Sequence, residues 1–88
     1  MEKNRQILKF PLSMYNSFSL SKTSKFLHIG LENDKLYMWF IVDLDGEKIK
    51  RNFTLVKDYA ILNDVKTDPI YLGSICYKNE TFHLFETF

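Results

Sequence analysis

The chain has 88 residues, of which 12 are basic and 11 acidic, so its formal net charge is only +1. This balance excludes binding that is driven by long-range attraction to nucleic acid or to an anionic membrane. The hydrophobic content of 45% and the aromatic content of 16% exclude a disordered chain. We expect one folded domain over residues 1–88.

Cys76 is the only cysteine, which excludes an internal disulfide and favours a reducing compartment. No apolar run approaches the roughly 18 residues that a membrane-spanning helix requires. The N-terminal sequence MEKNRQILKF carries charge but no long apolar stretch, so a signal peptide is not expected. We therefore expect the protein in the cytoplasm of the cell that makes it.

Alternating polar and apolar residues predict short β-strands along the first half of the chain. The expected strands lie near residues 7–10, 15–20, 25–32 and 36–43. In the third of them, Leu27, Ile29 and Leu31 should share one face. Asn33-Asp34 follows it and can adopt the positive φ angles that a two-residue hairpin turn requires.

The fourth of these strands, LYMWFIVD at residues 36–43, is apolar on both faces. Its side chains should alternate between two sets, with Leu36, Met38, Phe40 and Val42 on one face and Tyr37, Trp39 and Ile41 on the other. A strand of this kind must be covered on both sides. One side should meet the core, and the other should be covered by residues 57–69, by a bound molecule or by a second subunit.

Three more strands are expected in the second half, near residues 49–56, 70–77 and 82–85. Asp45-Gly46 is predicted to form the turn before the first of them, and residues 78–81 the turn between the last two. Residues 57–69 break the pattern and predict a loop with at most one helical turn. About seven short strands predict an all-β fold, either a small antiparallel sandwich or a partly open barrel.

Five short motifs occur in order along the chain: Lys9-Phe10-Pro11-Leu12, Trp39-Phe40-Ile41-Val42-Asp43, Arg51-Asn52-Phe53, Tyr71-Leu72-Gly73-Ser74 and Phe82-His83-Leu84-Phe85-Glu86. Together they resemble a family of small proteins of unknown function that are encoded mainly by bacteriophages and prophages. The resemblance spans nearly the whole chain. It implies a phage-borne protein that acts in the cytoplasm of an infected bacterium.

One segment departs from the pattern of that family. Its members often carry a Gly-Thr-Gly loop after the Arg-x-Phe strand, whereas this chain has Lys57-Asp58-Tyr59-Ala60-Ile61. If the glycine loop binds a phosphate-bearing ligand in the family, this chain has either lost that site or rebuilt it.

The chain contains no Walker loop, nucleophile elbow, zinc-protease helix or dinucleotide fingerprint. Cys76 with His28 or His83 could form a nucleophile and a base, but strand alternation predicts that Cys76 is buried, where a free cysteine acts as a small hydrophobe. Two histidines without carboxylates at matching spacing do not predict a metal site. We therefore expect a protein that is not an enzyme, with no catalytic residue, metal or cofactor.

Arg51 falls on the apolar face of its predicted strand, where a guanidinium requires a carboxylate, phosphate or aromatic partner. Two interpretations are open. The first is an internal ion pair with Asp43 or Glu86. The second is a clamp on a ligand phosphate, assisted by Lys50.

Several aromatic residues could share one sheet face and stack on a ligand ring, or could form a plain core layer: Tyr37, Trp39, Tyr71 and Tyr77. His83 is expected at the surface, where it could donate a hydrogen bond to a ligand. The candidate ligand-binding residues are Arg51, Trp39, Tyr71, Lys50, Lys57, Tyr59 and His83.

These features indicate a stoichiometric binding protein with two alternative targets. In the first, a homodimer or higher oligomer sequesters a small nucleotide-derived signal of host immunity at the subunit junction, without binding DNA or RNA. In the second, the apolar sheet face covers a host defence or replication protein and blocks it. A minor virion or assembly component is a third, less favoured alternative.

Overall fold

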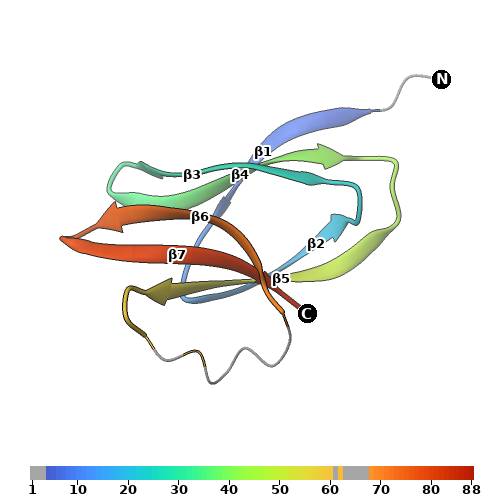
Figure 1. Cartoon of the computed structure of the whole chain (residues 1–88). Coiled ribbons are helices and arrows are strands. Elements are labelled where there is room, and N and C mark those ends of the chain that lie inside the picture. Colours follow the sequence, from blue (N-terminus) through green and yellow to red (C-terminus); the bar gives the residue numbers. More distant parts are fainter. Residues whose placement is uncertain (1–3, 61, 63–67) are drawn as a thin grey trace.

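The computed structural model describes residues 4–60, 62 and 68–88, which form seven antiparallel strands in two sheets (Figure 1). The strands are β1 (Arg5–Pro11), β2 (Tyr15–Ser21), β3 (Lys25–Glu32), β4 (Lys35–Asp43), β5 (Lys48–Lys57), β6 (Ile70–Tyr77) and β7 (Glu80–Thr87). Within these ranges there is no helix long and apolar enough to cross a membrane.

The two sheets pack face to face as an open sandwich. The three-stranded sheet has the order β1-β4-β3, and the four-stranded sheet has the order β2-β5-β7-β6. Hairpins join β3 to β4 and β6 to β7, whereas the chain changes sheet between β1 and β2, between β2 and β3, and between β4 and β5 (Figure 1). The predicted all-β sandwich is confirmed, and the sheets do not close into a barrel.

Both hairpins are closed by two-residue turns in the left-handed conformation. Asn33 and Asp34 have φ angles of 53° and 62°, and Lys78 and Asn79 have φ angles of 51° and 63°. Positive φ at both central residues matches the twist of the flanking strands. The turn predicted at Asn33-Asp34 is confirmed, and the last hairpin turn is shorter than predicted because Glu80 already begins β7.

The hairpin turn predicted at Asp45-Gly46 is wrong. This segment joins β4 to β5, which lie in different sheets, and Gly46 does not have a positive φ. The residue must nevertheless be small, because a Cβ on Gly46 would lie 2.6 Å from the Cβ of Ser21. Close approach of two chain segments, rather than turn geometry, explains the glycine.

The core lies between the sheets and takes alternate residues mainly from the central strands β4, β5 and β7, with one residue each from the edge strands β2 and β3. Its buried apolar members are Leu20, Ile29, Met38, Phe40, Val42, Phe53, Leu55, Phe82 and Leu84. The rings of Phe40 and Phe53 connect the two layers edge to face, with centroids 5.4 Å apart. The alternation predicted for β4 is confirmed, since Met38, Phe40 and Val42 are buried while Tyr37, Trp39 and Ile41 are only half-buried.

A β-bulge in β3 reverses the alternation of side chains. The register with β4 shifts between Phe26 and His28, and as a result Phe26 and Ile29 both pack on the core. Leu27 is exposed and leaves the face of Ile29, so the prediction is wrong for Leu27. Ile29 and Leu31 lie opposite Met38 and Leu36 and share a face as predicted, although Leu31 is exposed near the end of the strand.

A second bulge lies in β6, where the register with β7 shifts between Tyr71 and Gly73. Leu72 and Ile75 both pack against the core as a result, although three positions separate them. Cys76 is therefore exposed, and the prediction of a buried cysteine is wrong.

The segment after β5 begins with a turn in which the amide of Ala60 donates to the carbonyl of Lys57 at 3.1 Å. Tyr59 has a φ of 64° and is 98% exposed. These residues lie beside the four-stranded sheet, on the side of Tyr71 and His83, and not over Trp39. The helical turn predicted within residues 57–69 would fall largely on residues 61 and 63–67, which lie outside the described residues.

Candidate functional site

The seven candidate ligand-binding residues fall in three separate places. One hollow brings together Lys57, Tyr59, Tyr71 and His83. Arg51 and Lys50 line a different cleft, and Trp39 lies on the outer face of the three-stranded sheet. The structure therefore brings four of the predicted residues to one site and separates the other three from it.

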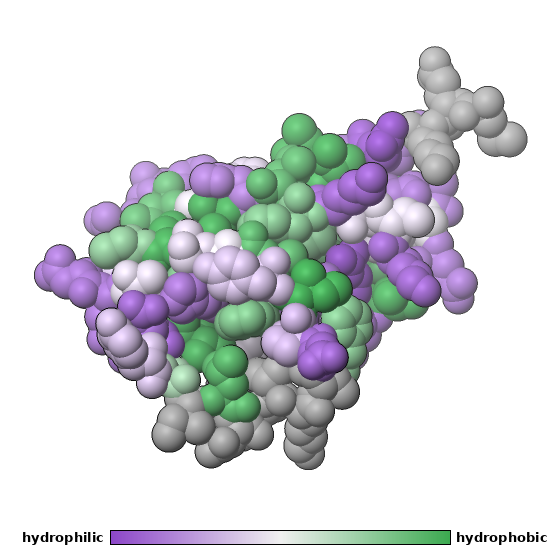
Figure 2. All heavy atoms as spheres, viewed as in Figure 1, coloured by the Kyte–Doolittle hydropathy of each residue, from purple (hydrophilic) through white to green (hydrophobic). Residues whose placement is uncertain are grey.

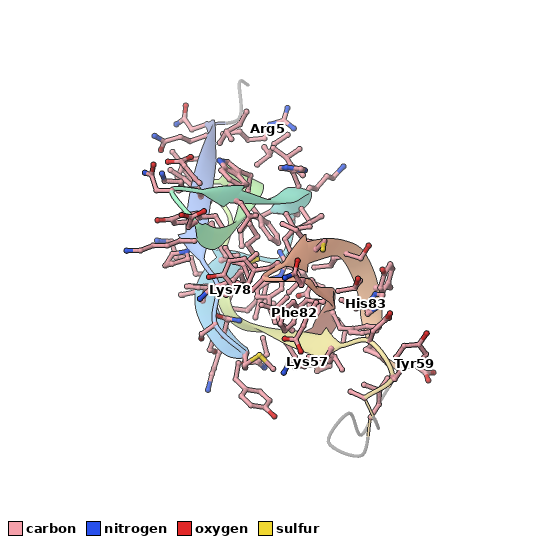
Figure 3. The ribbon with its side chains drawn as sticks, turned by 90° about the vertical axis from the view of Figure 1, so that its left-hand side faces the viewer. Arg5, Lys57, Tyr59, Lys78, Phe82 and His83 are labelled. Atoms are coloured by element: carbon pink, nitrogen blue, oxygen red, sulfur yellow. The ribbon has the colours of Figure 1, made fainter. Side chains whose placement is uncertain are left out.

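The hollow has a volume of about 260 Å³ and lies on the outer face of the four-stranded sheet. It is formed by the end of β5, by the turn after it, and by outward-pointing side chains of β6 and β7. Figure 3 shows Lys57, Tyr59 and His83 together at this end of the molecule. The rings of Tyr71 and Phe85 meet edge to face at 5.3 Å and form its aromatic wall.

A chain of hydrogen bonds holds the polar side of the hollow. His83 Nε2 lies 2.7 Å from Asp58 Oδ1, and His83 Nδ1 lies 2.9 Å from the hydroxyl of Tyr71. A carboxylate only accepts, so Nε2–H donates to Asp58, and Nδ1 is bonded to the Tyr71 hydroxyl. The two neighbours thus fix the orientation of the His83 ring.

Asp58 was not among the predicted site residues. It is separated from His83 by 25 positions, and nothing in local strand alternation indicates that they meet. The available signal was its position in the segment 57–61, which departs from the expected family pattern. Sequence reasoning selected its neighbours Lys57 and Tyr59 there, but not the carboxylate between them.

The charges around the hollow favour an anionic group on one side only. Lys57 Nζ lies 3.3 Å from Glu80 Oε2, and both side chains are about half exposed. Such an exposed pair is weak, so Lys57 is free to turn toward a ligand. The carboxylate of Asp58 lies at the His83 side and repels anions there, so a phosphate could be held only at the Lys57 side.

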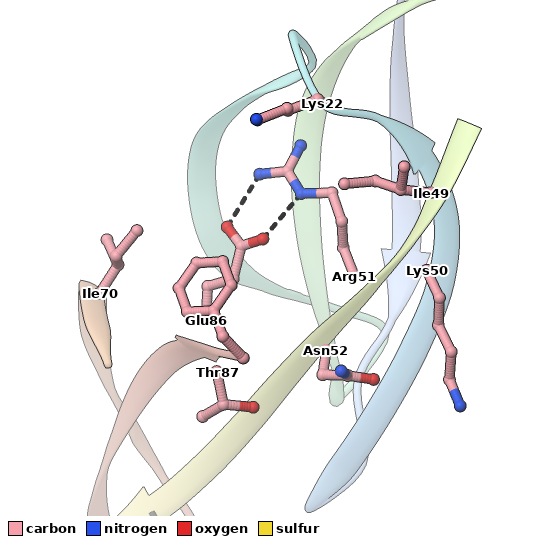
Figure 4. Close-up of a pocket in the computed structure, with 9 residues that line it drawn as sticks. Lys22, Ile49, Lys50, Arg51, Asn52, Ile70, Glu86 and Thr87 are labelled. Atoms are coloured by element: carbon pink, nitrogen blue, oxygen red, sulfur yellow. Dashed lines mark hydrogen bonds and ion pairs between the residues drawn. The ribbon is translucent and has the colours of Figure 1, made fainter. Parts of the chain in front are cut away.

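Arg51 is bound within the protein (Figure 4). Its Nε and Nη2 donate to the two carboxylate oxygens of Glu86, at 2.7 and 2.8 Å. Its Nη1 donates to the backbone carbonyls of Ser21 and Ser24, at 3.0 and 2.8 Å. Four contacts therefore occupy most of the donors of the guanidinium.

The surroundings of Arg51 also indicate that it stabilises the fold and does not bind a ligand. The guanidinium lies 5.3 Å from the ring centre of Phe40 and 5.9 Å from that of Phe53, at the end of the core. The cleft of about 390 Å³ beside it is lined by Lys50 but also by the carboxylate-bearing Glu86. The internal ion pair with Glu86 is the interpretation that the geometry supports, and a phosphate clamp would have to break it.

The outer face of the three-stranded sheet carries Trp39 between Tyr37 and His28, with ring centres 6.1 and 5.6 Å away. Gly30 makes room for these rings, since a Cβ there would lie 2.7 Å from His28 Nε2. The ammonium of Lys9 covers the ring of Tyr37 at 4.7 Å. Trp39 is thus half covered by side chains of its own sheet.

Lys9 also pairs with Glu32 across this face. The hydrogen bond from the ammonium to that carboxylate raises the pKa of Lys9 above its ordinary value.

Figure 2 shows exposed hydrophobic residues at the upper edge of the molecule, beside β1. In this sheet Ile7 is 63% exposed and Leu27 45% exposed. The face is therefore mixed, with an apolar edge.

The face predicted to be shared by four aromatic residues is wrong. Tyr37 and Trp39 lie on the outer face of the three-stranded sheet, and Tyr71 lies on the outer face of the other sheet. Tyr77 packs against the core, and its hydroxyl donates to the carbonyl of Asp34 at 3.0 Å. The bulge in β6 places Tyr71 and Tyr77 on opposite faces.

A family model described as "Domain of unknown function (DUF7352)" matches residues 3–88. The chain belongs to the DUF7352 family. No curated protein and no solved structure matches the chain. Membership of DUF7352 agrees with the expected family of unknown function, whereas the phage origin stays a prediction.

Among the residues that the structure describes, no three His, Cys, Asp or Glu side chains are grouped so that they could hold a metal ion.

Proposed function

We propose that this protein is a non-enzymatic binding protein that sequesters a small nucleotide-derived immune signal. In this proposal it is encoded by a bacteriophage and acts in the cytoplasm of the infected bacterium. The observation that carries the proposal is the convergence of Lys57, Tyr59, Tyr71 and His83 on one hollow. These residues come from three parts of the chain that only the fold brings together.

The size of the hollow supports a ligand that is only partly held by one subunit. At about 260 Å³ it lies just below the range of about 300–1,000 Å³ that is typical of small-molecule pockets. Tyr59 is 98% exposed and Tyr71 is 52% exposed, so the Tyr59 ring is open all round and the Tyr71 ring is open on one side. One planar ring of a ligand fits this site, and a second subunit would cover the rest of the molecule.

Each side chain has a role that its chemistry allows. Tyr71 and Tyr59 offer ring faces on which a base can stack. The Tyr71 hydroxyl, which His83 and Asp58 hold in place, keeps one hydrogen-bonding position for a polar group at the edge of the base, whereas both nitrogens of His83 are occupied within the protein. Lys57 neutralises a phosphate. Arg51 has no part in this site, because its donors are bound within the protein.

The test is a titration of the protein with a panel of cyclic dinucleotides and ADP-ribose isomers, followed by thermal unfolding and calorimetry. At about 100 times its Kd, a true ligand stabilises the fold by about 2.7 kcal/mol, which raises Tm by about 10–20 °C in a domain of this size. Sequestration of a scarce signal requires nanomolar affinity, or about −12 kcal/mol.

Variants separate the hollow from the rest of the surface. Tyr71→Ala should weaken binding by about 1–3 kcal/mol through loss of stacking. Tyr71→Phe keeps the ring and should lose only the contribution of the hydroxyl, about 1 kcal/mol. Lys50→Ala, in the other cleft, is the control and should bind normally. If no compound of the panel changes Tm, the proposal fails.

The second candidate is an inhibitor that covers a host defence or replication protein with the outer face of the three-stranded sheet. The observation that favours it is the exposed apolar edge formed by Ile7 and Leu27 beside the half-buried Trp39. Trp39→Ala should then weaken capture of one identified host polypeptide by about 2 kcal/mol or more. If Trp39→Ala and Tyr71→Ala capture that polypeptide equally well, this candidate is refuted.

A further inference from the structure

We propose that two copies of the chain pair antiparallel through β2, so that their four-stranded sheets join into one continuous sheet. β2 lies at one edge of the four-stranded sheet. It pairs with β5 on one side, and no strand within the described ranges pairs with its other side. The inference rests on this edge and does not depend on the ligand-binding hollow.

The hydrogen-bond pattern shows which backbone groups of β2 are available. The amide of Leu55 donates to the carbonyl of Met14 at 2.9 Å, so this pair of positions is hydrogen-bonded. In an antiparallel ladder such pairs alternate, which directs the amides and carbonyls of every second residue toward β5. The amides and carbonyls of the residues between them point away from β5: Tyr15, Ser17 and Ser19. The Tyr15 carbonyl accepts from the Ser13 hydroxyl at 3.1 Å, so Ser17 and Ser19 supply the pairing groups.

The other three sheet edges carry features that prevent pairing. β1 carries Arg5 and Lys9 and ends at Pro11. β3 and β6 each contain a bulge, and they lie against each other where the two sheets meet. β2 has the sequence YNSFSLS, with no charge, no proline and no bulge over its seven residues. Of the four edge strands, β2 is therefore the one best able to pair with another strand.

The composition of β2 suits a second copy of itself. Because β2 carries no charge, pairing it with its own copy brings no like charges together. With Phe18 on the two-fold axis, Ser17 of each copy lies opposite Ser19 of the other. These residues then form two hydrogen-bonded pairs, each exchanging both backbone bonds.

The same register extends the aromatic core across the two-fold axis. Phe18 is half-buried on the core side of β2, where its ring lies 4.9 Å from that of Phe10 and 6.4 Å from that of Phe53. In the pair, the two Phe18 side chains occupy a non-hydrogen-bonded position, where Cβ atoms are closest. On the opposite face the small side chains of Ser17 and Ser19 leave no obstacle to close approach.

The experiment measures mass by light scattering from about 1 μM to about 1 mM, a range that covers ordinary dimer affinities. The expected result is a rise from 10.5 kDa toward twice that mass. Ser17→Pro should raise the dissociation constant of the dimer about tenfold or more, because it removes an outward amide in each copy. It costs no backbone hydrogen bond to β5, and the bond from the Ser17 hydroxyl to Asn52 is lost in the control variant as well.

Ser17→Ala is the matched control, because it keeps the amide and removes only the hydroxyl that bonds to Asn52. It should dimerise like the parent chain. Hydrogen exchange on the parent chain gives a second reading that needs no variant. The amides of Ser17 and Ser19 should exchange more slowly at concentrations where the dimer forms than where it does not.

Three outcomes overturn the proposal. The first is a mass of 10.5 kDa at every concentration. The second is a dimer in which the amides of Ser17 and Ser19 exchange as fast as in the monomer, since its interface would lie elsewhere. The third is equal dimerisation of Ser17→Pro and Ser17→Ala.

Discussion

Replacement of Arg51 by Ala should remove a large part of the stability of the fold. The side chains of Arg51 and Glu86 are only 12% and 6% exposed. Removing one partner of a buried ion pair costs about 3–5 kcal/mol, because the other charge stays buried without compensation. A domain of 88 residues has a total free energy of unfolding of about 4–13 kcal/mol. The variant should therefore lose at least about a quarter of this free energy, and nearly all of it if the parent chain lies at the lower end of the range.

The assay is urea denaturation at pH 7, followed by far-UV circular dichroism and by the fluorescence of Trp39. Arg51→Ala, Glu86→Ala and the double variant form a cycle whose coupling energy should be about 1–3 kcal/mol. Arg51→Lys keeps the charge but not the planar fork, so its loss should be intermediate. Lys50→Ala, at the exposed neighbouring position, should change stability by less than about 0.5 kcal/mol.

The stabilising role of the Arg51–Glu86 ion pair is refuted if Arg51→Ala loses no more stability than Lys50→Ala. The guanidinium would then not depend on Glu86, and its donors would be available to a ligand. The phosphate-clamp interpretation of Arg51 would become the better one. A coupling energy near zero in the cycle would have the same meaning, since it would show that the two side chains act independently.

Three further predictions test other parts of the fold. Gly46→Ala places a Cβ against that of buried Ser21 and should cost about 1–3 kcal/mol in urea denaturation, whereas Gly73→Ala makes only ordinary contacts and should cost less than about 1 kcal/mol. Equal losses would contradict the packing argument. Asn79→Gly removes the strain of a positive φ and should stabilise the fold by about 0.5–1 kcal/mol in the same assay, while a loss would contradict the turn geometry. Cys76 should react with a thiol reagent such as DTNB in the folded protein, and a requirement for denaturant would contradict its exposure.

Strand positions could be predicted because they depend on local pattern. In β4 the period of two separates buried Met38 from half-buried Trp39, and any strand with this alternation gives the same result. The turn at Asn33-Asp34 could be predicted because these residue types tolerate positive φ better than most. Both properties are present in the residues themselves, whatever the rest of the chain does.

The failures arise where one extra residue changes the register. A bulge moves every later side chain of a strand to the other face. In β6 the isolated Gly73 lies at the bulge and was an available signal, whereas in β3 no glycine or proline lies between Phe26 and His28. The exposure of Leu27 and of Cys76 follows from these bulges. The error at Gly46 has a related origin, since an Asp-Gly pair is typical of a hairpin, but here the chain crosses between sheets.

Long-range pairs were only partly predictable. The burial of a guanidinium indicated that Arg51 needs a partner, and Glu86 was one of two carboxylates considered. The link between Asp58 and His83 gave no such signal, because both side chains are polar and partly exposed. Residues that satisfy a strong physical requirement can be paired from sequence, whereas residues that merely meet at the surface require the fold.

The apolar outer face of β4 shows why the proposed binding site lies elsewhere. The sequence suggested that a loop, a ligand or a second subunit must cover Trp39. The described part of residues 57–69 lies at the other sheet, and side chains of β3 and β4 provide part of the cover instead. Since Gly30 lets the His28 ring lie beside Trp39, the need for an external partner is smaller there. Tyr71 also has ring neighbours, Phe85 and His83, but it is 52% exposed and Tyr59 is 98% exposed, so both keep more open ring area than half-buried Trp39 and a ligand gains more by binding to them.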